Sequence, residues 1–285
     1  CTGRIIAAVY FQRKKPWTEN GWLLRTERKV KTAEDSKSII MKKFLLTFIC
    51  CLALPAAAFA YNANDVQQVQ NGISCPGADL SGADLSGLNL NGINLRGANL
   101  NGARLADTDL SGADLQNANM HRAVFKNCTL TKANLSGADL SYANLNGNKL
   151  DKAVLNNAVL YRTGLRGADL NYASFAYAKL QEATLDKANA QNADLSYAGM
   201  SYSWLYKTDL TGAVLTHANL YNAKMQNSVL TNADLTSANL SRSNLQHAQL
   251  NGARLDRAML DDADFSYADL TLTDFGRAFK DNAKF

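Results

Sequence analysis

The sequence is poor in the residues that break or cross-link a chain, with 3 prolines and 5 cysteines among 285 residues. Only Cys75 and Cys128 lie beyond residue 60, which is too few for a disulfide-built fold. Histidine is also scarce: His121, His217 and His247 are the three present, and their spacing is not that of metal ligands. We therefore expect no metal, no cofactor and no catalytic centre.

Neither basic nor acidic residues predominate when residues 1–60 are left out of the count. The chain holds 30 Lys/Arg and 25 Asp/Glu, but residues 1–60 contain 11 of the former and 4 of the latter. From Tyr61 onward 19 basic and 21 acidic residues remain, a net formal charge of −2. This balance supplies neither the basic surface that binds nucleic acid nor a strongly acidic one. Direct nucleic-acid binding is not predicted.

Residues 41–60 have the pattern of a secretory signal. Met41, the first methionine, precedes Lys42 and Lys43, an apolar run over 44–54 and the small-residue ending Ala58-Phe59-Ala60. A basic start, a short apolar core and such an ending are typical of a signal peptide. We expect cleavage before Tyr61, a periplasmic or secreted product, and no stable membrane span after cleavage.

Residues 1–40 show no periodicity, and we expect a non-native upstream segment or a disordered one. Two alternatives remain open for the N-terminal region. Residues 1–40 could be native, with 44–60 as a short membrane anchor. Cys50 or Cys51 could carry a lipid, although Ile49 before Cys50 disfavours this because such signals need a small residue there.

From Ala78 to Phe285 the sequence repeats every five residues without a shift of phase. Every fifth residue from Leu80 is apolar except Lys280, and most are leucine. Two residues earlier the chain is small, with Ala at 31 of 42 places. Among these 84 residues only Lys280 is charged. Both positions must therefore face inward.

Neither a helix nor a flat strand places apolar residues at these two positions of every five, so the chain must turn once per repeat. Four repeats then close a square coil of 20 residues, and coils stack through backbone hydrogen bonds. The 42 repeats make about ten coils, a rod of roughly 50 Å at ~4.8 Å per coil. Residues 20 apart should stack on one face.

The motif Ala-(Asp/Asn)-Leu-x-x, as in Ala78-Asp79-Leu80-Ser81-Gly82, resembles the pentapeptide-repeat family over residues 78–285. The resemblance implies an all-β fold, a right-handed quadrilateral β-helix. It also implies end-to-end dimerisation in some relatives and DNA mimicry in others. Many relatives open their repeats with Cys-x-x-Cys-Asp-Leu, whereas here Cys75 is followed by Ala78, which places a paired-cysteine role in doubt.

The two ends of the solenoid need cover, because each exposes unpaired backbone and apolar surface. Residues 61–77 are predicted to form an N-terminal cap, a short helix with Asn64 as N-cap and with Val66, Val69 and Ile73 facing the first coil. At the other end, phenylalanines either plug the last coil or join two copies in an end-to-end homodimer. These residues are Phe265, Phe275, Phe279 and Phe285.

The outward aromatic residues are the candidate interaction patch, because aromatic side chains are enriched in binding sites. We expect Tyr177, Tyr197 and His217 to stack, with Tyr202, Trp204 and Tyr206 close by and Lys224 resting on the Trp204 ring. Alternatively the stacked rings only brace the outer face.

Two functions follow from these features. The first is an exported, non-enzymatic scaffold rod that binds a protein partner which the sequence does not identify. The alternative, implied by the family resemblance, is a DNA-mimicking rod that binds and protects DNA gyrase. The alternative would require an acidic surface and a cytoplasmic location, and the sequence predicts neither.

Overall fold

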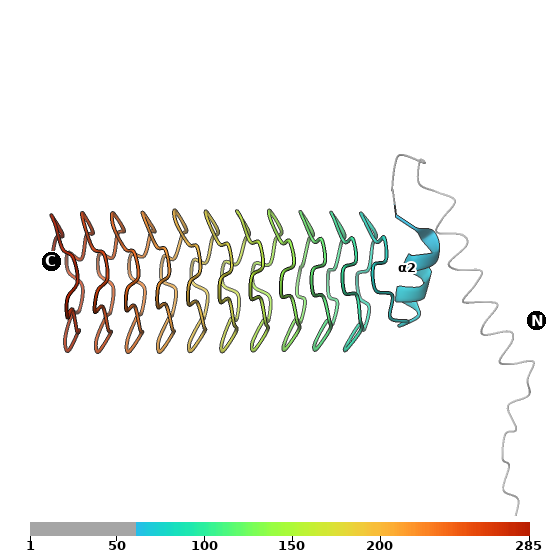
Figure 1. Ribbon diagram of the computed structural model, residues 1–285. Coiled ribbons are helices and arrows are strands. Elements are labelled where there is room, and N and C mark those ends of the chain that lie inside the picture. The colour runs from blue at the N-terminus through green and yellow to red at the C-terminus, as the bar shows by residue number, and fades with distance from the viewer. Residues whose placement is uncertain (1–60) are drawn as a thin grey trace, which may run out of the picture. The chain divides into compact units, whose positions relative to one another are not determined.

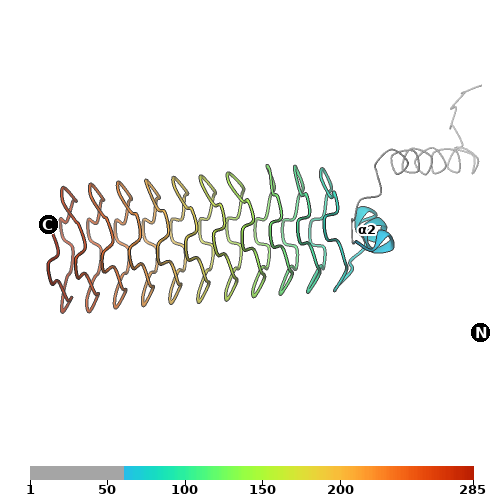
Figure 2. The same cartoon turned by 90° about the horizontal axis from the view of Figure 1, so that it is seen from above.

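The computed structural model describes residues 61–285, so the predictions for residues 1–40 and for the signal at 41–60 lie outside it. Its repeat segment is a stack of square coils, with helix α2 at the N-terminal end (Figure 1). The view from above shows the same regular stacking along the segment (Figure 2). The described residues thus form a solenoid of one coil type repeated.

Consecutive coils are joined by parallel bridges between residues 20 apart, from Asp79 with Asn99 to Asp264 with Lys284. Each bridge is a single residue wide, so residues 61–285 contain no extended strand. A typical contact is the Leu80 N–H donating to the Asn99 carbonyl at 2.7 Å. The quadrilateral coil and its 20-residue repeat are confirmed.

Each five-residue side ends in a turn whose last residue has left-handed backbone geometry. Gly82, with φ of 67°, is an example, and Tyr202 adopts the same geometry with φ of 60°. Glycine and asparagine tolerate this conformation best, whereas bulky residues rarely adopt it. An aromatic residue at one of these turns therefore adopts a backbone conformation that is less strained for glycine.

The inward positions are buried along almost the whole column, as predicted. Three polar residues that replace the inward alanine are satisfied by backbone groups. The Thr163 hydroxyl donates to the Leu140 carbonyl at 2.8 Å, and the Thr208 hydroxyl donates to the Leu185 carbonyl at 2.8 Å. Asn148 both donates to a carbonyl and accepts from a backbone N–H. Cys75, which is partly buried, and Cys128, which is buried, are both free cysteines and form no disulfide with each other.

The aspartates and asparagines before the inward leucines form the turns. Their side-chain oxygen accepts a hydrogen bond from the backbone N–H two residues later, as from Ser111 to Asp109 at 2.9 Å. Asn119 does the same for His121 at 3.2 Å. Asp and Asn side chains favour such turns because they replace a backbone acceptor. Much of the acidic content is therefore structural.

Helix α2 (Ala63–Gln70) covers the first coil. Its N-cap is Asn62, whose side chain accepts from the Asn64 N–H at 3.0 Å, so the prediction of Asn64 as N-cap was wrong by two residues. Val69 is buried and Val66 packs against the core, but Ile73 is 50% exposed and does not face the coil as predicted. Ile73 lies past the helix end, where the helical spacing used to place it no longer applies.

The helix also satisfies the open backbone edge of the first coil. The Asp65 carboxylate accepts from the Asp79 N–H at 2.9 Å, and the Asn62 N–H donates to the Asp79 carbonyl at 3.0 Å. Ser74 and Cys75 bond the next stretch of the edge through Asn94. Residues 62, 65, 74 and 75 thus supply hydrogen-bond partners for the exposed edge of the first coil.

At the C-terminal end of the solenoid no helix follows within the described residues, and three phenylalanine rings pack together. Phe265 stacks on Phe285 at 5.4 Å between ring centroids, and Phe275 meets both rings edge-on. We call these three residues the Phe cluster. Phe279 is not part of it, because it lies on a side of the coil above Met259 and is 62% exposed. Lys280, the charged exception, lies with its ammonium over the Phe275 ring.

Candidate binding surface

One side of the solenoid carries Trp204, and we call it the Trp204 face. It consists of the bridged column of residues 20 apart that runs from Asp84 to Lys284. In its central part the column reads Gly164, Thr184, Trp204, Lys224. The indole is 52% exposed between small neighbours on one side and a lysine on the other.

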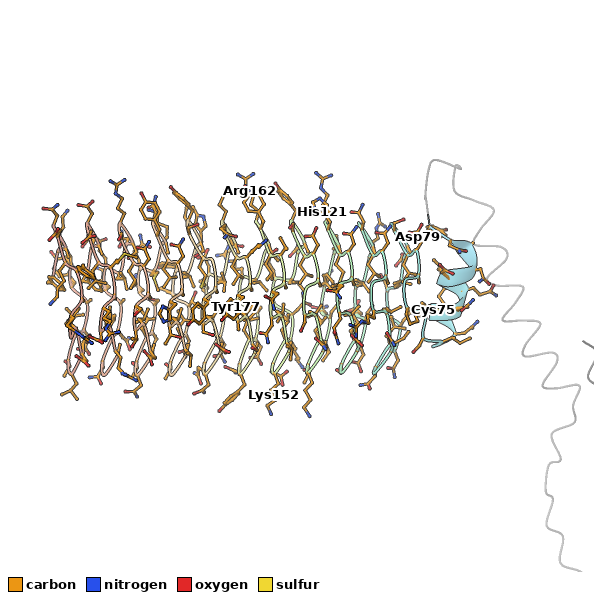
Figure 3. The ribbon with its side chains drawn as sticks, viewed as in Figure 1. Cys75, Asp79, His121, Lys152, Arg162 and Tyr177 are labelled. Carbon is orange, nitrogen blue, oxygen red and sulfur yellow. The ribbon has the colours of Figure 1, made fainter. Side chains whose placement is uncertain are left out.

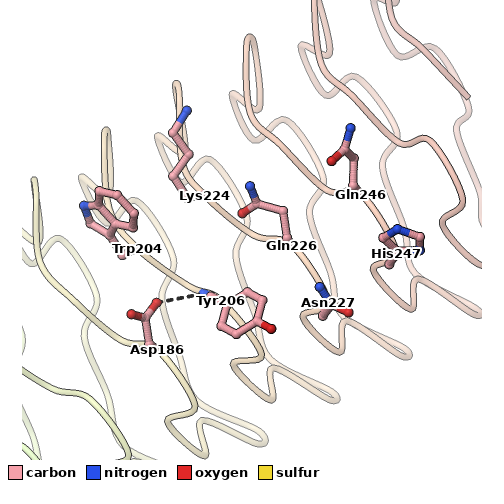
Figure 4. A pocket seen from close by; sticks show the side chains of 8 residues that line it. All are labelled: Asp186, Trp204, Tyr206, Lys224, Gln226, Asn227, Gln246 and His247. Carbon is pink, nitrogen blue, oxygen red and sulfur yellow. Dashed lines mark hydrogen bonds between the residues drawn. The ribbon is translucent and has the colours of Figure 1, made fainter.

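Trp204 stands at a position where Asp or Asn accepts the turn hydrogen bond in many other repeats, as Asp209 does. The missing acceptor is supplied from the preceding coil, where Asp186 accepts from the Tyr206 N–H at 3.0 Å (Figure 4). Asn146 replaces a missing acceptor for Arg166 in the same way, at 2.7 Å. The turn after Trp204 is therefore kept although Trp204 cannot form it.

Two shallow hollows lie on either side of the Trp204 and Lys224 side chains, which line both. The larger has a volume of about 640 Å³ and is open to solvent. Its side chains stand on successive coils, as Figure 4 shows. The larger hollow is lined by Asp186, Trp204, Tyr206, Lys224, Gln226, Asn227, Gln246 and His247; the smaller is lined by Arg162, Glu182, Thr184, Tyr202, Trp204, Asn222 and Lys224.

Two of the charged groups of the smaller hollow, Arg162 and Glu182, form an ion pair. Arg162 bonds Glu182 at 2.7 Å, and the Tyr161 hydroxyl donates to the same carboxylate at 2.9 Å. The hydrogen bond from Arg162, and after it that from Tyr161, lowers the pKa of Glu182. Glu182 is therefore ionised at neutral pH, and the charge of Arg162 is largely compensated.

The prediction that Lys224 rests on the Trp204 indole is wrong. The Lys224 ammonium donates to the Asn222 side-chain oxygen at 3.0 Å, and no cation lies over the Trp204 ring among residues 61–285. The reason is local, because Asn222 offers an acceptor in the same turn. A lysine does lie over Tyr206, where the Lys207 ammonium is 5.1 Å from the ring centroid.

The predicted patch separates into two groups on different parts of the coil. Tyr177, Tyr197 and His217 form the expected ladder, with centroid distances of 4.8 and 4.7 Å and nearly parallel rings. The side made by residues 198–200 lies between this ladder and Tyr202. Figure 3 shows Tyr177 away from the edge that carries Arg162. Only Tyr202, Trp204 and Tyr206 belong to the Trp204 face and its two edges.

Sequence reasoning missed further aromatic residues on the Tyr202 edge. Tyr221 meets the Tyr202 ring at 5.7 Å, and Tyr142 contacts both His121 and Tyr161. The signal was available, since these positions share the 20-residue register with Tyr202 or with its preceding residue. His247 stacks on Tyr267 at 5.1 Å on the opposite edge of the Trp204 face.

The chemistry of the described surface is dispersed. Within residues 61–285 no group of three or more His, Cys, Asp or Glu is arranged to hold a metal ion. The C-terminal aspartates are partly neutralised, as where Asp256 pairs with Arg257 and Arg277. Over the same residues, no helix has the length and apolar character needed to cross a membrane.

A family model described as pentapeptide repeats matches the chain in overlapping segments from residue 78 to residue 277, with 8 copies. The match covers more than half of the sequence. This chain belongs to the pentapeptide-repeat family. Among proteins of curated function, none matches it.

Solved structures of other pentapeptide-repeat proteins are similar to this family member. HetL, involved in heterocyst differentiation regulation in the cyanobacterium Nostoc sp. strain PCC 7120, is 31% identical over 78% of this chain and 96% of its own, with a TM-score of 0.44. QnrB1, a plasmid-mediated fluoroquinolone resistance protein, is 18% identical over 69% of this chain and 88% of its own, with a TM-score of 0.29. A thylakoid-lumen protein of Arabidopsis thaliana is 24% identical over 46% and 71%, with a TM-score of 0.28.

Proposed function

We propose that this pentapeptide-repeat protein is an exported, non-enzymatic rod that binds a partner through the Trp204 face. The observation that carries the proposal is the half-exposed Trp204, which stands on the outer surface at a position that in many other repeats forms the turn. A tryptophan there adds nothing to the buried column and removes a local hydrogen-bond acceptor. Such a residue is best explained by what its ring contacts outside the molecule.

The aromatic neighbours of Trp204 support the same conclusion. Tyr202 is 50% exposed at a left-handed turn position, where glycine would adopt the backbone geometry with less strain. Tyr206, on the other edge, is 37% exposed, and its backbone N–H donates to Asp186. Exposed aromatic residues flanked by polar groups are the usual composition of a recognition surface. The Tyr177 ladder has full stacking contacts of its own, so bracing accounts for it without a partner.

A non-catalytic role is supported by the filled interior and the dispersed outer groups. Catalysis requires a base, an acid or a nucleophile to converge on one reacting atom. Here the three histidines lie in separate ring contacts, with Tyr142, Tyr197 and Tyr267. A rigid rod with a localised aromatic surface suits binding or scaffolding.

Nothing in the described residues favours the gyrase-protecting alternative. DNA mimicry needs a dense and uncompensated acidic surface. In this chain Asp109, Asp209 and Asp264 accept turn hydrogen bonds from neighbouring Ser or Thr residues. Basic residues are interspersed with the acidic ones, and the charge from Tyr61 onward is −2.

For the last coil we propose an end-to-end contact with a second copy. Among the described residues, the backbone N–H groups of Leu270, Phe275, Lys280 and Phe285 have no acceptor, and Leu272 and Phe285 are largely exposed. A two-fold contact would cover both kinds of group. Sedimentation of the wild type and of Phe285→Ser tests this: we expect a dimer that the substitution dissociates, and a wild-type monomer contradicts it.

Export is tested by fractionating cells that translate the chain from Met41 and sequencing the N-terminus of the product. We expect a product that starts at Tyr61 outside the cytoplasm. The matched control is Ala58→Arg, which blocks the small-residue cleavage motif and should leave the precursor uncleaved. An uncleaved wild-type protein in the cytoplasm would contradict export and return the gyrase alternative to consideration.

A further inference from the structure

The two hollows beside Trp204 carry aromatic rings and no aliphatic side chains of the core type. Their lining contains no Val, Leu, Ile or Met, so the only extended apolar surface is the faces of aromatic rings. A ligand with a flat apolar face matches such rings.

The two hollows together carry charges of both signs. Asp186 and Lys224 line the larger hollow, and in the smaller one, which Lys224 also lines, the Arg162 charge is paired with Glu182. A polyanion would meet these carboxylates, and a polycation would meet the lysine and arginine. A neutral ligand with many hydrogen-bonding groups fits this surface best.

Hydrogen-bonding groups surround the rings and are still available. Gln246 donates to Asp264 at 2.8 Å through its amide nitrogen, which leaves the amide oxygen as an acceptor. The side-chain amides of Gln226 and Asn227 have no partner among residues 61–285. An amide offers both donors and an acceptor, as a hydroxyl-rich ligand requires.

From these features we infer that the Trp204 face binds a neutral glycan, with one sugar ring packed on the Trp204 indole and the hydroxyls of neighbouring rings bonded by Gln226, Asn227 and Gln246. The inference rests on the proposed function and names the ligand class of that same surface. A pyranose ring has the required chemistry, a flat face of C–H groups ringed by hydroxyls. The hollows extend from Arg162 to His247, about four coils or ~19 Å at ~4.8 Å per coil, enough for a short oligosaccharide.

Trp204 itself provides the test, because it is one of 3 tryptophans and the others are Trp17 and Trp22. In the full chain carrying Trp17→Phe and Trp22→Phe, its fluorescence reports on this surface alone. We expect a saturable change in emission on titration with chitohexaose or cellohexaose. No change with either sugar at millimolar concentration would overturn the inference.

Calorimetry of variants locates the site. Trp204→Ala should weaken sugar binding at least tenfold, and Trp204→Phe should weaken it less. Tyr172→Ala is the matched control, because Tyr172 is an equally exposed tyrosine on an edge that does not border the Trp204 face. Circular dichroism checks the fold of each variant. Equal losses for Trp204→Ala and Tyr172→Ala would contradict the assignment.

A photo-crosslinking residue at position 226 or 172 separates failure of this inference from failure of the proposed function. If a protein crosslinks at position 226 but not at 172, and no sugar changes the Trp204 emission, the glycan assignment is overturned. The proposed binding role of the Trp204 face would then remain. Absence of crosslinks at 226 together with no sugar binding would contradict both.

Discussion

Trp204 and Leu205 are consecutive in the chain but belong to regions with opposite constraints. Leu205 is fully buried in a column where nearly every neighbour is Leu or Ala, whereas Trp204 is half exposed on a surface whose composition changes from coil to coil. The column tolerates little variation because its interior is close-packed. The outer surface needs only to keep its turn hydrogen bonds. The interior is thus set by two positions in five, and the other three form the turns and the outer surface.

The largest effect should come from placing a charge in the column. Leu180→Asp buries a carboxylate with no partner, so we expect loss of the cooperative unfolding transition and of the β signal in circular dichroism, a cost of several kcal/mol. Leu180→Met, which conserves volume, should cost less than about 1.5 kcal/mol. A folded Leu180→Asp protein of wild-type stability would contradict the inward assignment.

An intermediate effect is expected at the turn after Trp204. Asp186→Ala leaves the Tyr206 N–H without its acceptor and should destabilise the protein by about 1 kcal/mol in chemical denaturation. Asp186→Asn keeps the acceptor and serves as the control. Adding Trp204→Asp to Asp186→Ala should restore stability, because an aspartate at 204 forms the turn locally as Asp209 does for Thr211. If the changes in unfolding free energy of Asp186→Ala and Trp204→Asp simply added, Asp186 would not be the acceptor that replaces residue 204 for the Tyr206 N–H.

A smaller effect should appear on acidification. Hydrogen bonds from the Ser111 hydroxyl and backbone N–H lower the pKa of Asp109 in the folded protein. Because the folded pKa is below the unfolded one, the carboxylate contributes stability above the unfolded value, and this is lost as pH falls from about 4 through the folded pKa. Asp109→Asn keeps the acceptor without a titrating group, so its melting temperature should fall less than that of the wild type in acid. Equal falls would contradict this role.

Much of the fold could be predicted from the sequence because each coil repeats one local rule. The inward positions and the Tyr177 ladder follow from the five-residue and 20-residue periods. Where the period ends, prediction was less accurate: the helix cap is Asn62 and Ile73 is exposed. Those features depend on how α2 meets the first coil, which no repeat encodes.

The candidate surface was predicted only in part, for a geometric reason. Sequence spacing shows which residues stack, but grouping Tyr177 with Trp204 required knowing which sides of the square they occupy. Residue 204 offers no acceptor for the Tyr206 N–H, and Asp186 on the preceding coil accepts this hydrogen bond in its place. The sequence does not show that the Asp186 side chain points toward the next coil. The Lys224 ammonium bonds the Asn222 side chain, two residues earlier in the chain, and does not lie on the Trp204 indole. Sequence spacing alone does not show which of these two contacts a lysine makes.

The most direct test of the separation between column and surface is to compare the adjacent variants Trp204→Ala and Leu205→Ala in equilibrium unfolding. Leu205→Ala should lose about 2–5 kcal/mol, because it opens a cavity in the column. Trp204→Ala should stay within about 0.5 kcal/mol of the wild type, as for other surface substitutions. If Trp204→Ala were as destabilising as Leu205→Ala, the indole would be part of what holds the fold together, and its exposure could not be assigned to binding.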